Sequence, residues 1–211
     1  MRVSTLLSLV LLSLVVQSSR AQPLDEISYV VSEVLSTSDW AADVNSCPSE
    51  MAQSKEASVR AQATDCRPGS LKSCLRRCQA GVPGACYWLG HAVRGEGKGR
   101  LAANVLYQRS CKLGVPSGCT NRAAGMSLES EGSETVQACA ARTFEKTCGL
   151  DDPWGCTMYA FHLSRGLGTP ANRELALEVL KKSCKYGPED EACDYGLGLR
   201  EQLLKGKGAA K

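Results

Sequence analysis

The stretch Cys111-Lys-Leu-Gly-Val-Pro-Ser-Gly-Cys119 places two cysteines eight residues apart across a turn that contains glycine and proline. This spacing recurs, one residue longer in the last case, in the pairs Cys78–Cys86, Cys148–Cys156 and Cys184–Cys193. The first cysteines of successive pairs are 33, 37 and 36 residues apart. A period in this range is typical of arrays of helical repeats. The sequence therefore predicts a repeat protein and not a single globular unit.

The segment before each first cysteine has the pattern of a helix that packs closely on a neighbour. An alanine stands eight positions before the cysteine and a large apolar residue four before it, in the pairs Ala103 and Tyr107, Ala140 and Phe144, and Ala176 and Leu180. Residues four apart share one helix face. Glycine and proline then form a turn, after which a new helix is expected to start at Cys86, Cys119, Cys156 and Cys193. A further helix is predicted over 171–184, with Pro170 at its first position.

The predicted fold is therefore all-α, an α/α solenoid of disulfide-stapled antiparallel helix pairs. Each staple would join the last turn of one helix to the first turn of the next, where a bridge needs about 5.5 Å between Cα atoms. Cys66 and Cys74 are again eight residues apart and favour a fifth bridge, which leaves Cys47 to pair with Cys139. A buried unpaired thiol at Cys139 is the alternative. Because no Cys-x-x-Cys occurs and no histidine stands at ligand spacing from a cysteine pair, neither a metal nor another cofactor is expected.

Residues 1–21 have the layout of a secretory signal peptide. Arg2 precedes the apolar run Leu6–Val16, and Ser19-Arg-Ala21 offers a small-x-small cleavage site. This run is too short to cross about 30 Å of hydrocarbon as a helix, which argues against a membrane anchor. Cleavage after Ala21 would leave 190 residues with a net charge of +1. Together with the cysteines, this layout predicts a secreted or periplasmic protein, without distinguishing the two compartments.

The turn motif Cys-x-Leu-Gly-Val-Pro-x-Gly-Cys at 111–119, with Gly155-Cys156 and Ala85-Cys86-Tyr-Trp-Leu-Gly90, resembles the Sel-one-like branch of the tetratricopeptide-type repeats. More narrowly, it resembles the cysteine-rich bacterial members of that branch, the Helicobacter cysteine-rich protein type, which carry a cysteine pair eight apart in each repeat. The resemblance covers about residues 66–200 and implies about four repeats within 66–204. The pattern weakens in the third unit, at 121–133, and the Asp-x-x-Lys-Ala that usually starts the second helix is absent.

The residues outside the repeats are expected to cover the end of the array. One helix face gathers the apolar residues Leu24, Ile27, Val30, Val31, Val34 and Leu35. We therefore interpret residues 22–65 as an N-terminal capping helix followed by a loosely ordered connector over 41–65, since end repeats need a polar cover. Residues 205–211, which contain Lys-Gly-Lys-Gly, are expected to be a flexible tail.

The concave groove of such a solenoid is lined mainly by the first helix of each repeat. By register, the candidate groove residues are Trp88, His91, Asn121, Arg122, Met158, Tyr159 and His162. For Trp88 and Tyr159, packing between neighbouring helices is an equal alternative. Either histidine could serve as a general base, but a partly exposed histidine on a solenoid face explains each more simply. No catalytic residue is named, because disulfide-bonded cysteines have no thiolate and no Ser-x-x-Lys or Gly-x-Ser-x-Gly occurs.

These features predict a non-enzymatic scaffold that binds a protein or peptide in its groove, with a secreted effector as one version of this role. The resemblance also implies an alternative, because members of the cysteine-rich family are associated with binding and slow hydrolysis of β-lactams. The small net charge and the absence of a Lys/Arg-rich block exclude a strongly basic nucleic-acid binder. We expect a monomer that makes no membrane contact after signal cleavage.

Overall fold

The computed structural model describes residues 23–50, 52, 66–95, 97–130 and 132–206. The proposed signal peptide, residues 1–21, lies outside the described residues. The described residues form helices and contain no strand. In chain order these elements are α1 (Pro23–Ser36), α2 (Ser38–Asp43), the short 3-10 helix η1 (Pro48–Glu50), α3 (Leu71–Gln79), α4 (Pro83–Val93), α5 (Lys98–Lys112), α6 (Pro116–Glu129), α7 (Glu134–Gly149), α8 (Pro153–Arg165), α9 (Arg173–Val179), the 3-10 helix η3 (Leu180–Cys184) and α10 (Glu191–Lys205).

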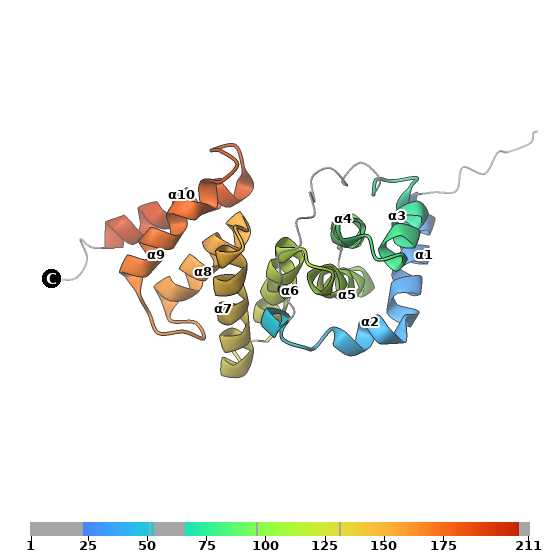
Figure 1. Cartoon of the computed structure of the whole chain (residues 1–211), viewed down its shortest axis with the longest axis horizontal. Helices are drawn as coiled ribbons and strands as arrows, with labels where there is room; N and C mark the ends of the chain where they lie inside the picture. The colour runs from blue at the N-terminus through green and yellow to red at the C-terminus, as the bar shows by residue number, and fades with distance from the viewer. Residues whose placement is uncertain (1–22, 51, 53–65, 96, 131, 207–211) are drawn as a thin grey trace, which may run out of the picture.

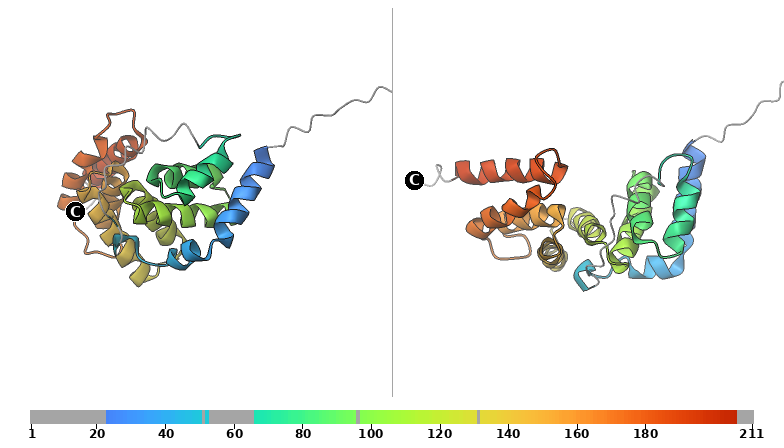
Figure 2. Two further views of the ribbon diagram at one scale, coloured as in Figure 1. Left: turned by 45° about the vertical axis from the view of Figure 1, so that its right-hand side comes forward. Right: turned by 45° about the horizontal axis from the view of Figure 1, so that its top comes forward.

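Helices that are neighbours in the chain are also neighbours in space, so the fold is an all-α solenoid. Figure 1 shows α3 to α10 following one another across the molecule in chain order. Both views of Figure 2 keep this order, with α1 beside α3 at one end and α10 at the other. We call α4, α6, α8 and α10 the A helices and α3, α5, α7 and α9 the B helices. No helix in the described part of the chain is both long and apolar enough to span a lipid bilayer.

All twelve cysteines form disulfides. The bonds are Cys47–Cys139, Cys66–Cys74, Cys78–Cys86, Cys111–Cys119, Cys148–Cys156 and Cys184–Cys193. The last five are the pairs expected from the spacing, and Cys47–Cys139 is the pair that remained, in place of the unpaired thiol that was the alternative at Cys139. In the last four, which we call the staples, the Cα atoms are only 4.3 to 4.7 Å apart. Three of the staples join the end of a B helix to the start of an A helix, and the fourth joins the end of η3 to the start of α10. The turn between them thus supplies the close approach that a short bridge requires.

The A helices begin earlier than expected. The first three start at Pro83, Pro116 and Pro153, three residues before the cysteine, because proline lacks an N–H and is pre-set for the first helical position. In the first two turns a glycine in the left-handed region, Gly81 or Gly114, ends the preceding helix. Asp151, with φ of 62°, takes the place of glycine before α8. In all three turns, the proline therefore opens the next helix.

In three of the four staples, a Ser or Thr precedes the first cysteine and packs against the next A helix. Ser110, Thr147 and Ser183 are fully buried. Each lies where a glycine of the next A helix leaves room for it, in the pairs Ser110 and Gly118, Thr147 and Gly155, and Ser183 and Gly196. A Cβ atom on Gly118 would stand 2.8 Å from the Ser110 hydroxyl, closer than real Cβ atoms come. The small hydroxyl and the glycine together let consecutive helices approach closely.

The N-terminal residues do more than cap one end of the array. Val30, Val31 and Val34 of α1 are buried in the core formed with α3, α4 and α5, as the apolar face predicted. Residues 37–50, which we call the strap, then continue past α5 to α7, where Cys47 is bonded to Cys139. Figure 1 shows α2 beneath α5 and η1 near α6 and α7. The first part of the expected loose connector, residues 41–50, is thus packed on the solenoid, whereas 53–65 lie outside the described residues.

The last B helix is shorter than the predicted run 171–184. It begins at Arg173 because the Asn172 side chain caps it, accepting a hydrogen bond from the Leu175 N–H at 3.0 Å. Pro170 therefore lies in the preceding loop and not at the first helical position. After α9 the chain tightens into η3, which ends at Cys184. Helix α10 ends at Lys205, and residues 207–211 of the expected tail lie outside the described part of the chain.

Candidate functional site

The A helices share one surface, which repeats with the cysteines. Residues two and five positions after the A-helix cysteine are at least partly exposed in all four helices. We call this set the A-helix face, and it consists of Trp88, His91, Asn121, Ala124, Met158, Phe161, Tyr195 and Gly198. The residues three positions after the cysteine are buried in every A helix. The staples therefore fix not only where each A helix begins but also which side of it faces the solvent.

Four of the seven residues expected in the groove lie on this face, namely Trp88, His91, Asn121 and Met158. The other three are buried. Arg122 is 4% exposed, and its Nε donates to the Val44 carbonyl of the strap at 2.9 Å. Tyr159 packs in the core, and its hydroxyl donates to Glu145 at 3.0 Å. For Tyr159 the structure thus has the helix-packing arrangement that was the alternative.

His162 is a core residue of α8. It is fully buried, its ring lies 4.9 Å from that of Phe144, and its Nδ1 is 2.9 Å from the Leu167 carbonyl. Because a carbonyl only accepts hydrogen bonds, Nδ1 carries the proton. Burial lowers the pKa of His162, so the ring is neutral at pH 7. The environment of His162 is that of a packed core and not of a groove.

An aromatic cluster forms the α4 end of the A-helix face. The ring of His91 lies 4.7 Å from that of Tyr87, 5.5 Å from Trp88 and 5.4 Å from Tyr107. Burial, helped by the charge of Arg94, lowers the pKa of His91 to about 4, which leaves the imidazole neutral at pH 7. Edge-on contacts of this kind stabilise aromatic groups and hold the rings in place. This end of the face is therefore rigid and uncharged.

Asn121 connects the aromatic cluster to the next A helix. Its side-chain amide donates to the Tyr87 hydroxyl at 3.4 Å and to the Ser117 carbonyl at 3.1 Å. Burial, with the charge of Asp152, raises the pKa of Tyr87, so this hydroxyl stays protonated. Asp152 is itself buried and accepts hydrogen bonds from Ser117, Thr120 and the Gly155 N–H. Burial raises the pKa of Asp152 in spite of these three bonds.

The other end of the face is hollowed. A groove of about 550 Å³ runs between α8 and α10, and we call it the α8–α10 groove. Its lining residues are Phe161, Asp194, Tyr195, Leu197, Gly198, Leu199, Glu201 and Gln202. Tyr195 is 65% exposed and its ring lies 5.3 Å from that of Trp154. The Arg165 guanidinium lies over the ring of Phe161 at 5.6 Å. The groove thus has aromatic and aliphatic walls with acidic side chains beside them.

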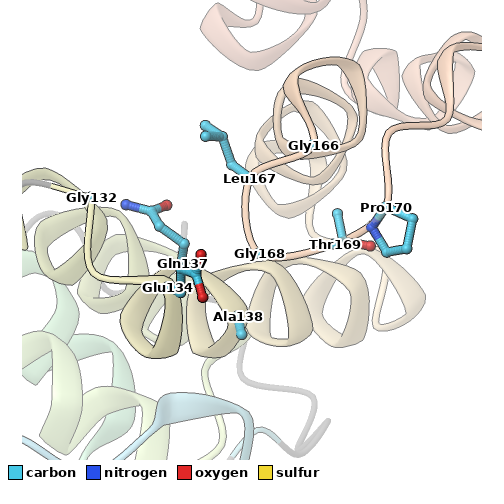
Figure 3. A pocket seen from close by; sticks show the side chains of 9 residues that line it. All are labelled: Gly132, Glu134, Gln137, Ala138, Gly166, Leu167, Gly168, Thr169 and Pro170. Atoms are coloured by element: carbon cyan, nitrogen blue, oxygen red, sulfur yellow. The ribbon is translucent and has the colours of Figure 1, made fainter.

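A second pocket, of about 520 Å³, lies where the loop between α8 and α9 crosses the start of α7. Figure 3 shows Leu167, Gly168 and Pro170 of this loop beside Glu134, Gln137 and Ala138 of α7. Both ends of the Gln137 amide are occupied within the protein, because it accepts from the Ser127 hydroxyl and donates to the Ser127 carbonyl and to Ser130. The side chain of Gln137 therefore joins the α6–α7 turn to α7.

The described residues contain no group of three or more His, Cys, Asp or Glu side chains that could hold a metal ion. Comparison with known protein families, with curated proteins and with solved structures gives no match. The candidate site therefore follows from the side chains of this chain alone. Phe161 and Tyr195 are its two aromatic residues that the sequence reasoning missed. They stand five and two positions after Cys156 and Cys193, at the same offsets as His91 and Trp88 after Cys86, so a strict count from the cysteines would have found them.

Proposed function

We propose that this protein is a non-catalytic, disulfide-rich Sel-like repeat scaffold that binds a peptide or protein segment in the α8–α10 groove. The observation that carries the proposal is the aromatic wall of that groove, formed by the exposed Tyr195 and the partly exposed Phe161. Aromatic side chains at a hollow surface are the usual anchors of protein recognition. Phe161 is partly exposed, whereas Tyr159, His162 and Leu163 of the same helix are buried, so Phe161 offers a surface to a partner.

The lining of the groove indicates the kind of segment that it would bind. Leu197 and Leu199 with the two rings suit one apolar or aromatic side chain. Asp194 and Glu201 would attract a basic residue beside that anchor, although Glu201 already pairs with Lys205 at 2.5 Å. We therefore propose a partner segment with an apolar anchor next to lysine or arginine.

The staples support this role because they hold the A helices in one arrangement before a partner arrives. A rigid surface loses less conformational entropy on binding than a flexible one. Six disulfides also suit an oxidising environment. With the leader-like residues 1–21, this favours a secreted or periplasmic scaffold that acts as a monomer.

The test is selection of binding peptides from a random library on the oxidised protein, followed by calorimetric titration of the selected peptides. Tyr195→Ala is expected to weaken binding about tenfold, as truncation of an anchoring aromatic does. Tyr186→Ala is the matched control, because Tyr186 is also exposed, at 51%, but lies outside the groove. Asp194→Asn should reduce the salt dependence of binding, since it removes a charge at the rim. Selected peptides that bind wild type and Tyr195→Ala equally would contradict the proposal.

The same preparation also tests for catalysis. The resembled family is associated with β-lactams, so the oxidised protein is incubated with a chromogenic cephalosporin and then examined by intact mass spectrometry. Our proposal requires no turnover above buffer and no covalent acyl adduct. Turnover or an adduct would show that the protein acts as a β-lactam hydrolase or acceptor.

A further inference from the structure

The strap is held by side chains from three consecutive helices. Gln108 of α5, Arg122 of α6 and Lys146 of α7 all donate hydrogen bonds to it. The bonds run from Gln108 Nε2 to the Asp43 and Ser46 carbonyls (2.8 and 3.1 Å), from Arg122 Nε to the Val44 carbonyl (2.9 Å) and from Lys146 Nζ to the Ser49 carbonyl (2.7 Å). The side chains of the solenoid thus contact the backbone of residues 43–49.

Between its two ends, the strap makes few contacts through its own side chains. Val44 packs against the core, whereas Asn45 and Ser46 are exposed. Among the described residues, one ion pair joins the strap to the solenoid, with Lys112 Nζ and Asp43 Oδ2 2.5 Å apart. Every residue has a carbonyl group, so the same donors could bind the backbone of another segment that takes up the helix-end and turn conformation of the strap. The acidic residue opposite Lys112 adds a preference for charge.

Each end of the strap is fastened separately. Trp40 is buried, with the Arg109 guanidinium 5.3 Å from its ring. Cys47 is bonded to Cys139, 92 residues later, and this is the only disulfide that joins the strap to a helix. Cys47 is partly exposed, whereas both cysteines of three of the staples are buried. Reduction of the Cys47–Cys139 bond would therefore leave residues 41–50 held by non-covalent contacts alone, while the staples keep the helices folded.

The surface beneath the strap carries positive charge. Lys112, Arg122 and Lys146 all contact the strap, and Glu129, 3.7 Å from Arg122 Nη1, is the acid paired with Arg122. Arg122 is nearly fully buried, and a buried guanidinium is costly unless its hydrogen bonds are made. Once the strap leaves, the Nε of Arg122 loses the Val44 carbonyl. An arriving acidic peptide would give Arg122 a carbonyl again and would place a carboxylate opposite Lys112.

We propose that this strap surface of α5, α6 and α7 is a second binding site, for an acidic peptide, and that the chain itself occupies it while Cys47–Cys139 is intact. A dithiol reductant opens the site. The dithiol delivers two electrons and two protons, the sulfur–sulfur bond breaks to give two thiols, and the reductant becomes a disulfide. The site shares no residue with the α8–α10 groove, so it stands independently of the proposed function.

The first test captures a peptide at the site. In the full mature chain, Cys47→Ser leaves one thiol, Cys139, beneath the strap. The probe is a synthetic peptide of residues 41–50 whose cysteine carries a thiopyridyl group, so that attack by the Cys139 thiolate forms a mixed disulfide and releases thiopyridone. The control peptide has lysine in place of Asp43. Intact mass spectrometry is expected to show capture of the probe about threefold faster than of the control.

Exchanging the charge on the protein completes the test. The Lys112 side chain is 49% exposed, and Lys112→Glu in the Cys47→Ser background should make capture of the lysine peptide faster than capture of the probe. Capture of both peptides at one rate would overturn the proposal, and so would no capture at all.

Wild-type protein treated with increasing dithiothreitol and then alkylated provides a check without substitutions. Cys47 and Cys139 should be alkylated before any staple cysteine, and alkylation of the staples first would also overturn the proposal.

Discussion

Replacing Gly168 by alanine should destabilise the fold more than any other glycine substitution in the loop between α8 and α9. Gly168 has φ of 63°, and a Cβ atom there would overlap the carbonyl group of Gln137 on α7. The left-handed conformation costs alanine about 1–2 kcal/mol. The overlap adds about 1–3 kcal/mol, because the obstacle is helix backbone and not the end of a flexible side chain. We expect a total loss of about 3 kcal/mol or more.

Gly166 is the matched control, two residues away in the same loop. Its φ is 69°, but a Cβ atom there would come no closer than 3.4 Å to any other atom, the nearest being the Ala171 Cβ. Gly166→Ala should therefore cost only the conformational part, about 1–2 kcal/mol. Urea unfolding of the oxidised proteins, followed by circular dichroism, measures both free energies of unfolding. Equal losses in the two variants would refute the steric argument, since they differ only in what the Cβ atom contacts.

Three further predictions concern the disulfides and two buried ionisable groups. Replacing Cys47 and Cys139 by serine should lower the free energy of unfolding by about 4.6 kcal/mol, whereas replacing one staple pair should lower it by about 2.6 kcal/mol. The difference arises because a bond that closes a longer loop restricts the unfolded chain more. Denaturant unfolding measures both values. Because the pKa of His91 is lowered to about 4, its contribution to the free energy of unfolding is present above pH 6.5 and is lost as the pH falls to about 4. The loss is up to about 3 kcal/mol. Unfolding of wild type and His91→Gln over this pH range measures it. The raised pKa of Asp152 gives the opposite dependence of stability on pH, because the folded state binds the proton more tightly than the unfolded state. The free energy of unfolding of wild type relative to Asp152→Asn should therefore fall as the pH rises above about 4. A rise would contradict the argument from burial.

The helix pairs could be predicted because a disulfide between two cysteines limits the distance between their Cα atoms. A bridge across eight residues requires two Cα atoms within a few ångströms, and a tight turn between helices satisfies this while keeping the hydrophobic pattern on both sides. Proline explains the one systematic difference, since Pro116 and its counterparts start the A helices three residues before the cysteine. The spacing carries no information about where the turn ends and the helix begins.

The exposed side of each A helix was harder to predict. Successive residues of a helix point about 100° apart, so an offset of one position moves a side chain from the surface into the core. Met158 and Tyr159 are neighbours in sequence, yet Met158 lies on the A-helix face and Tyr159 in the core. Both side chains are large and mostly apolar, so residue type alone does not show which of the two is exposed. Comparing all four A helices at a common offset from the cysteine would have done so.

The path of the strap could not be read from its sequence at all. Residues 43–49, Asp-Val-Asn-Ser-Cys-Pro-Ser, have little to bury and no periodicity. The groups that hold them are carbonyls, which are the same in every residue. The partners, such as Gln108 and Arg122, would be assigned to the surface by their polarity, although both are buried. Only the pairing of Cys47 with Cys139 indicated where this segment goes.

The arrangement of the disulfides also sets an order of events while the protein is made. A chain is synthesised from its N-terminus, so the members of a staple emerge almost together and can find one another before later cysteines are present. Cys47 is the first cysteine to emerge and must remain unpaired while Cys66, Cys74 and the following pairs appear, until Cys139 is reached. Correct maturation thus depends on the local bonds forming quickly enough to remove competing thiols. The earliest cysteine waits the longest for its partner.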